Sequence, residues 1–155
     1  MNYGKIYLND VINGEGLRVS LFVSGCTIHC PGCFNKEAQD FNYGKPFTIN
    51  EENKIINQLN NDKIKYKGLS ILGGEPFDNA EELIPFVERV KFDTKDKDIW
   101  IWSGYTEEQI LKDNIKRELY NLCDYAVLGP FIENLKDLSL KFRGSSNQKI
   151  IKIHE

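Results

Sequence analysis

Three of the four cysteines of the chain lie in one short stretch, Gly25-Cys26-Thr27-Ile28-His29-Cys30-Pro31-Gly32-Cys33-Phe34-Asn35. Their spacing is C-x3-C-x2-C, and thiolates this close together in a loop select zinc or an iron–sulfur cluster. A structural zinc ion needs four protein ligands, so His29 or Cys123 would have to complete the site. A 4Fe–4S cluster held by three thiolates instead leaves one iron open to a substrate. The cysteine pattern alone leaves both metals open.

The cysteine stretch follows the first of four apolar runs that predict β-strands, at residues 18–23, 68–72, 99–102 and 125–128. Helical patterns separate these strands. One follows a capping box at Thr48, one begins near Asn79, and one runs from a capping box at Thr106 to about Leu122. Strands that alternate with helices through short loops indicate a parallel sheet with right-handed crossovers. Because so few strands cannot close a full barrel, we predict an α/β fold, an open partial (β/α) barrel of mostly parallel strands.

Two regions outside these units are less regular. Residues 1–17 are predicted to be a lead-in segment that ends in a turn at 13–16, where glycines flank Glu15. Residues 149–153 alternate polar and apolar side chains, as an edge strand does. Pro85 is expected to kink the second helix or to delay its start.

The composition is that of an ordinary globular protein, with 155 residues, 41% of them apolar and 28% charged. This length fits one domain, which we expect to span residues 1–155. The net charge of −3 comes without a basic block, which argues against a nucleic-acid or anionic-membrane partner. The N-terminus lacks the apolar run of a signal peptide, and no apolar run is long enough to span a membrane. We therefore expect a cytoplasmic protein whose cysteines are reduced.

A second motif, Gly73-Gly74-Glu75-Pro76, follows the predicted strand at 68–72. Adjacent glycines let the backbone approach a ligand closely, and Glu75 adds a carboxylate that suits a ligand ammonium group. Taken alone, the motif also fits a tight turn whose glutamate favours the start of a helix. Because both motifs follow strands of one parallel sheet, we expect them at the same edge of that sheet.

Together, the two motifs resemble those of the radical S-adenosylmethionine superfamily. In that family the open iron of a 4Fe–4S cluster chelates the amino and carboxylate groups of S-adenosylmethionine, and an electron from the reduced cluster yields a 5′-deoxyadenosyl radical. The resemblance implies that three cysteines bind the cluster: Cys26, Cys30 and Cys33. It also implies a set of cofactor contacts: Gly73, Gly74 and Glu75 for the methionine ammonium, Gly32 and Phe34 for the adenine, and Ser103 and Tyr105 for the ribose. Core packing, for Phe34, and a plain turn, for the last two, are the alternatives.

Longer segments narrow the resemblance to glycyl-radical-enzyme activases, which begin with a segment similar to residues 13–18, Asn-Gly-Glu-Gly-Leu-Arg. Residues 100–105 (Trp-Ile-Trp-Ser-Gly-Tyr) and 142–148 (Phe-Arg-Gly-Ser-Ser-Asn-Gln) look like the branch that activates the anaerobic ribonucleoside-triphosphate reductase. That branch implies the glycine loop of the large reductase subunit as substrate and a reduced flavodoxin, or a similar protein, as electron donor. Within the last segment, three residues are candidates for contacts with cofactor or partner, or else belong to a solvated turn: Arg143, Ser145 and Asn147.

Departures from the activase pattern keep alternatives open. Activases often have proline where this chain has Glu15, and Gly-Glu-Gly also occurs in 7-carboxy-7-deazaguanine synthases, which act on a small molecule. Those enzymes follow the third cysteine with Asp-Thr, whereas this chain has Phe34-Asn35. Another glycyl-radical enzyme, such as pyruvate formate-lyase, is an alternative partner. His29 is assigned no role, and Cys123 is interpreted as a buried core cysteine.

Overall fold

The computed structural model describes residues 1–33 and 36–154. These residues form one seven-stranded sheet, in the order β3-β1-β2-β4-β5-β6-β7. Its centre consists of four parallel strands: β2 (Arg18–Val23), β4 (Gly68–Gly73), β5 (Asp98–Ser103) and β6 (Tyr125–Leu128). The sheet does not close on itself, and helices connect its parallel strands. The predicted α/β fold with an open, mostly parallel sheet is confirmed.

Antiparallel strands cover both edges of the parallel centre. They are β1 (Asn2–Asp10) beside β2, the short β3 (Lys45–Pro46) beside β1, and β7 (Lys149–Lys152) beside β6. The predicted edge strand near the C-terminus is therefore confirmed. The prediction of a lead-in segment over residues 1–17 was wrong, because residues 5–10 alternate between exposed and more buried positions and form most of β1.

The helices of the described residues are α1 (Ile49–Leu59), α2 (Ala80–Asp93), α3 (Glu107–Leu111) and α4 (Asn114–Leu122). Both predicted capping boxes are present, at Thr48 and Thr106. α2 starts at Ala80, directly after a 3-10 turn, η2 (Pro76–Asn79), and runs through Pro85. A delayed start at this proline was therefore a wrong prediction, because the buried stripe of α2 keeps the helix together on both sides of it.

The single helix predicted from Thr106 to about Leu122 is also wrong, because the chain breaks it into α3 and α4. Asp113 lies between the two helices and caps the second one. Its carboxylate accepts hydrogen bonds from the backbone nitrogens of Ile115 and Lys116, each at 3.0 Å. An aspartate that satisfies the first donors of a helix in this way starts a new helix rather than continuing an old one.

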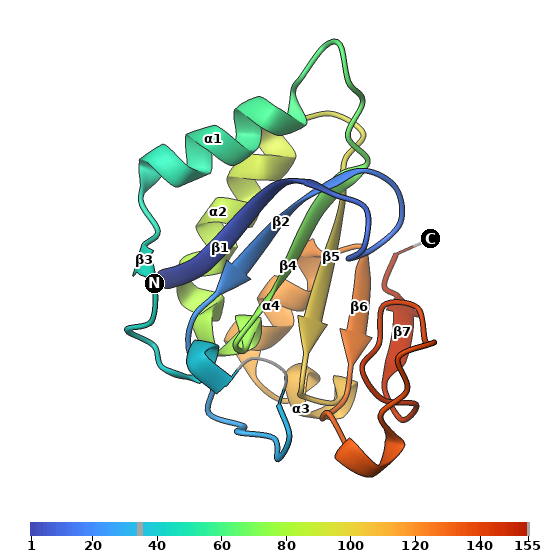
Figure 1. The fold of residues 1–155 in the computed structure, drawn as a ribbon. Helices are drawn as coiled ribbons and strands as arrows, with labels where there is room; N and C mark the ends of the chain where they lie inside the picture. Colours follow the sequence, from blue (N-terminus) through green and yellow to red (C-terminus); the bar gives the residue numbers. More distant parts are fainter. Residues whose placement is uncertain (34–35, 155) are drawn as a thin grey trace.

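Figure 1 shows α1, α2 and α4 on one face of the sheet. Their apolar side chains form the core there; Ile55, Phe86 and Leu119, for example, are at most 1% exposed. The C-terminal ends of the four parallel strands lie on the same side of the sheet, and the cysteine loop leaves the sheet there, directly after β2. Parallel α/β sheets place their functional loops at the C-terminal ends of their strands.

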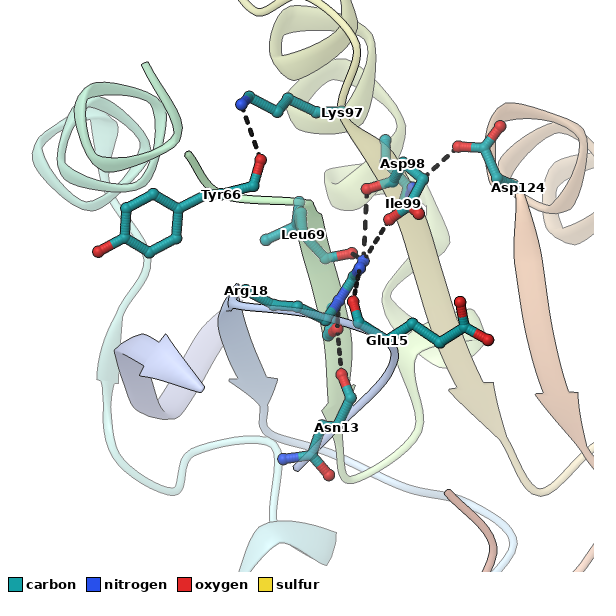
Figure 2. Close-up of polar contacts among 10 residues, drawn as sticks. Asn13, Glu15, Arg18, Tyr66, Leu69, Lys97, Asp98, Ile99 and Asp124 are labelled. Carbon is teal, nitrogen blue, oxygen red and sulfur yellow. Dashed lines mark hydrogen bonds and ion pairs between the residues drawn. The ribbon is translucent and has the colours of Figure 1, made fainter. Parts of the chain in front are cut away.

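The other face of the sheet carries a fully buried arginine, Arg18 of β2 (Figure 2). Its guanidinium donates to Ser70 Oγ (2.7 Å) and to the backbone carbonyl of Glu15 (2.9 Å). Its Nη2 lies 2.7 Å from the carboxylate of Asp98. Ser70 Oγ in turn donates to the carbonyl of Asn13 (2.6 Å). These contacts hold the loop between β1 and β2 against β4 on this face of the sheet.

Candidate active site

The cysteine loop is anchored where it leaves β2. Gly25 N donates to the carbonyl of Ala38 (2.7 Å), and Cys26 N donates to that of Gln39 (3.1 Å), in a short 3-10 helix, η1 (Lys36–Gln39). Gly25 has a φ of 103°, in the left-handed region that suits glycine. Cys26 is buried, and the other two cysteines of the loop are half-buried. The loop therefore has a fixed base and a more exposed tip.

A cavity of about 430 Å³ lies beside this loop, a size typical of small-molecule sites. The three cysteines of the loop line it, together with residues at or just after the ends of β4 and β5: Gly73, Gly74, Glu75, Ser103 and Gly104. Much of the remaining wall is apolar and includes Ile12, Phe22, Trp102 and Phe142. The structure thus brings the two sequence motifs together at one cavity.

The other two candidate metal ligands have protein partners of their own. His29 Nδ1 pairs with Gln39 Oε1 at 2.8 Å, and the fully buried Cys123 thiol donates to the carbonyl of Leu119 at 3.4 Å. Neither residue lines the cavity. Burial also raises the pKa of the Cys123 thiol, which disfavours the thiolate that a metal requires.

Glu75 is 1% exposed, and its carboxylate joins the end of β4 to the end of β5. The carboxylate accepts hydrogen bonds from three donors: Phe77 N (3.0 Å), Ser103 Oγ (2.8 Å) and Gly104 N (2.7 Å). Burial raises the pKa of Glu75 to about 7, although these hydrogen bonds act in the opposite direction. The Glu75 side chain therefore links the ends of β4 and β5 and also lines the cavity.

The two glycines before Glu75 are required by close backbone contacts. Gly73 has a φ of 113°, and a Cβ built on it would lie 2.3 Å from the carbonyl oxygen of Val23. A Cβ on Gly74 would lie 2.5 Å from the carbonyl oxygen of Gly25. No side chain fits at either position without moving the backbone of the cysteine loop or of β2. The glycine pair therefore sets how closely the two motifs approach each other.

Asp78, which no motif in the sequence indicates, connects the loops that follow three strands. One carboxylate oxygen accepts from the backbone nitrogen (2.8 Å) and the hydroxyl (2.9 Å) of Thr27, and the other accepts from the Tyr105 hydroxyl (2.6 Å). Tyr105 thus binds Asp78 and does not line the cavity, whereas Ser103 does. Burial, followed by the hydrogen bond to Asp78, raises the pKa of Tyr105 to about 12. In the sequence, the one indication of this role is that Asp78 is an acidic residue in the turn after Glu75.

Residues 142–148 form part of the cavity wall. Arg143 lines the cavity, its Nη1 donates to a carbonyl of the same segment at 3.2 Å, and its Nε is buried without a partner. Ser145 is fully buried, and Asn147 Nδ2 donates to the carbonyl of Pro130 at 2.8 Å. The segment is therefore a packed wall, which is not the solvated turn considered as an alternative.

The two residues predicted to lie near an adenine are Gly32 and Phe34. Gly32 has a φ of 72°, and a Cβ there would lie 2.8 Å from the side chain of Glu133; it does not line the cavity. Phe34 lies outside the described residues.

Comparisons with known proteins agree with this geometry. A family model described as a 4Fe–4S single cluster domain matches residues 12–151. The chain is 46% identical over 152 residues to the anaerobic ribonucleoside-triphosphate reductase-activating protein of Haemophilus influenzae, with 97% of each chain covered. It is 43% identical to the protein of the same name from Pasteurella multocida, with 97% of this chain and 96% of the relative covered. Identity to that of enterobacteria phage T4 is 38%, with 97% and 93% covered.

The chain belongs to the family of anaerobic ribonucleoside-triphosphate reductase-activating proteins. This membership confirms the resemblance drawn from the two motifs and the later segments, and it favours an activase over a deazaguanine synthase. It also confirms the predicted cofactors, a 4Fe–4S cluster and S-adenosylmethionine. Within residues 1–33 and 36–154, no helix has the length and apolar character needed to cross a membrane.

The cavity fits these cofactors through the chemistry of its donors. Three cysteine thiols supply the soft ligands that iron–sulfur clusters use. Arg143 lines the same cavity, and its permanent positive charge suits an anionic group there. In the part of the chain that the structure describes, no three His, Cys, Asp or Glu side chains are already gathered around a position for a metal ion. The fit of the cavity to these cofactors is therefore judged from the chemical types of the residues that line it.

Proposed function

We propose that this chain activates the anaerobic ribonucleoside-triphosphate reductase by generating a glycyl radical on its large subunit. The observation that carries the proposal is that the three cysteines and the Gly73-Gly74-Glu75 motif line one cavity. When bound, the 4Fe–4S cluster supplies the electron that cleaves S-adenosylmethionine. We place this activity in the cytoplasm, in a single domain, with a reduced flavodoxin or a similar protein as electron donor.

In this proposal each wall of the cavity has its own task. Cys26, Cys30 and Cys33 would hold three irons of the cluster, and neither His29 nor Cys123 lines the cavity to act as a fourth ligand. The backbone of Gly73 and Gly74 and the carboxylate of Glu75 orient the ammonium group of the cofactor. The apolar wall excludes water from the reacting atoms.

The proposal also concerns the shape of the substrate. The sheet is open, so the cavity is not enclosed by a barrel on all sides. A polypeptide loop that carries a glycine can approach such a cavity from its open side. The large reductase subunit is therefore a sterically suitable substrate.

The test is anaerobic turnover with the reductase. The reconstituted protein, S-adenosylmethionine and a chemical reductant are mixed with the large subunit, and the glycyl radical is measured by electron paramagnetic resonance. We expect one radical signal that depends on the large subunit and on Cys30, and that persists in Cys123→Ser. Cleavage without a radical on the reductase, together with turnover of a pterin substrate, would support the deazaguanine synthase alternative instead.

A further inference from the structure

The carboxylate of Asp78 lies where three loops meet: the cysteine loop after β2, η2 after β4, and the turn after β5. Both of its oxygens are used, one by the backbone nitrogen and hydroxyl of Thr27 and the other by the Tyr105 hydroxyl. The two hydroxyl oxygens lie 3.2 Å apart. Hydrogen bonds to an ionised acceptor are among the stronger ones in proteins.

Asp78 is itself held by a rigid turn. Its backbone nitrogen donates to the carbonyl of Glu75 at 3.0 Å, and the buried Glu75 carboxylate is bound to the end of β5. The neighbouring Phe77 is 1% exposed and packs in the core. Thr27, by contrast, is exposed and directly follows Cys26. The contact therefore runs from a fixed turn to the more exposed part of the cysteine loop.

We propose that Asp78 is a positioning residue that holds the first cysteine of the loop in place and keeps a negative charge beside the cluster. This inference rests on the proposed function, because it takes Cys26 as a cluster ligand. Residues behind the ligands of a metal site orient those ligands and tune the metal. A negative charge near a cluster stabilises its oxidised form and so lowers its reduction potential.

Two substitutions separate the geometry from the charge. In Asp78→Asn, the amide oxygen still accepts from Thr27 and the amide nitrogen can donate to the oxygen of the Tyr105 hydroxyl, so the contacts persist without the charge. Asp78→Ala removes both the contacts and the charge. Glu82→Gln is the matched control, because it removes one negative charge from an exposed position in the first turn of α2.

The geometric half is tested in the apoprotein by hydrogen exchange at the Thr27 amide. We expect exchange about tenfold faster in Asp78→Ala, as the loss of one charged hydrogen bond implies. Asp78→Asn should fall between the wild type and Asp78→Ala, because its neutral amide oxygen is a weaker acceptor, whereas Glu82→Gln should stay close to the wild type. A wild-type rate in folded Asp78→Ala would overturn the proposal. If that variant does not fold, Tyr105→Phe replaces it, with a smaller acceleration expected and an unchanged rate counting against the proposal.

The electrostatic half is tested in the reconstituted holoprotein by a redox titration followed by electron paramagnetic resonance. We expect the reduction potential of Asp78→Asn to be more positive than that of the wild type, and the shift in Glu82→Gln to be smaller. Equal shifts in the two variants, or none, would overturn this half. A wild-type chain that takes up no cluster would refute the proposed function. The exchange result in the apoprotein would still test, independently, whether Asp78 holds the loop at Thr27.

Discussion

At the scale of single residues, Glu75 is subject to two opposing effects. Removal from water disfavours its charge, while three hydrogen-bond donors around its carboxylate favour it. Burial prevails and raises the pKa of Glu75 from 4.5 to about 7. Between these two values the folded state binds more protons than the unfolded state, so stability falls as the pH rises through this window.

We therefore predict that the free energy of unfolding of the apoprotein decreases from pH 4.5 to pH 7 through Glu75 and that Glu75→Gln lacks this component. The substitution should also destabilise the protein by about 1–3 kcal/mol, because the amide nitrogen must face a buried backbone donor, at either Phe77 or Gly104. Urea denaturation at several pH values measures both effects, with the exposed Glu82→Gln as control. An identical pH profile in the two variants would contradict the assignment.

Residues of the site differ in how far the sequence alone reveals them. The cysteines and Gly73-Gly74-Glu75 stand directly after strands, so the topology of a parallel sheet predicts their common edge. The role of Asp78 depends on contacts with Thr27 and Tyr105, which lie 51 and 27 positions away in the sequence. Nothing in its own neighbourhood indicates these partners, so only the folded structure reveals them.

At the scale of elements, the loop between β1 and β2 depends on Arg18. Its guanidinium holds the carbonyl of Glu15 directly and, through Ser70, that of Asn13, which lines the cavity. A buried guanidinium paired with a carboxylate leaves an uncompensated charge behind when either partner is removed. The position of this cavity wall is therefore coupled to one ion pair.

We predict that Arg18→Met lowers the free energy of unfolding by about 3–5 kcal/mol, because the partly buried carboxylate of Asp98 loses its counter-charge. Adding Asp98→Asn should recover part of this loss, since the uncompensated charge is then gone. Urea denaturation of the two single variants and the double variant completes the cycle. Strictly additive losses would show that the pair does not act as a unit.

The break between α3 and α4 depends on Asp113. Replacement by alanine should destabilise the protein by about 1 kcal/mol, because two backbone donors at the start of α4 lose their acceptor. Thermal and urea unfolding measure the change. Glu118→Ala, at an exposed position later in α4, is the control, and an equal effect of the two substitutions would contradict the capping role.

Elements with strong local signals were predicted well. The strands at 18–23 and 125–128 and both capping boxes are as predicted, because apolar runs and caps are encoded within a few residues. The break at Asp113 was missed, since the apolar stripe continues through both helices while the cap acts on a single turn. β1 was missed because its alternation is incomplete and its pairing with β2 forms only in the folded sheet.

At the scale of the whole molecule, the cavity is assembled from distant parts of the chain. The cysteine loop, the ends of β4 and β5, the β1–β2 loop and residues 142–148 each supply one wall. α1, α2 and α4 lie together on one face of the sheet (Figure 1). A compact chain can thus combine a ligand set with a fixed, buried base and an open approach for a large partner.

The most direct test of this account is the metal content and spectrum of the anaerobically reconstituted protein. We predict about four irons and four sulfides per chain, and a reduced-cluster spectrum that changes when S-adenosylmethionine is added. Alanine at Cys26, Cys30 or Cys33 should abolish this loading, whereas Cys123→Ser should leave it intact. A colourless protein with one zinc ion, or a cluster that is lost in Cys123→Ser, would contradict the open iron on which the activity depends.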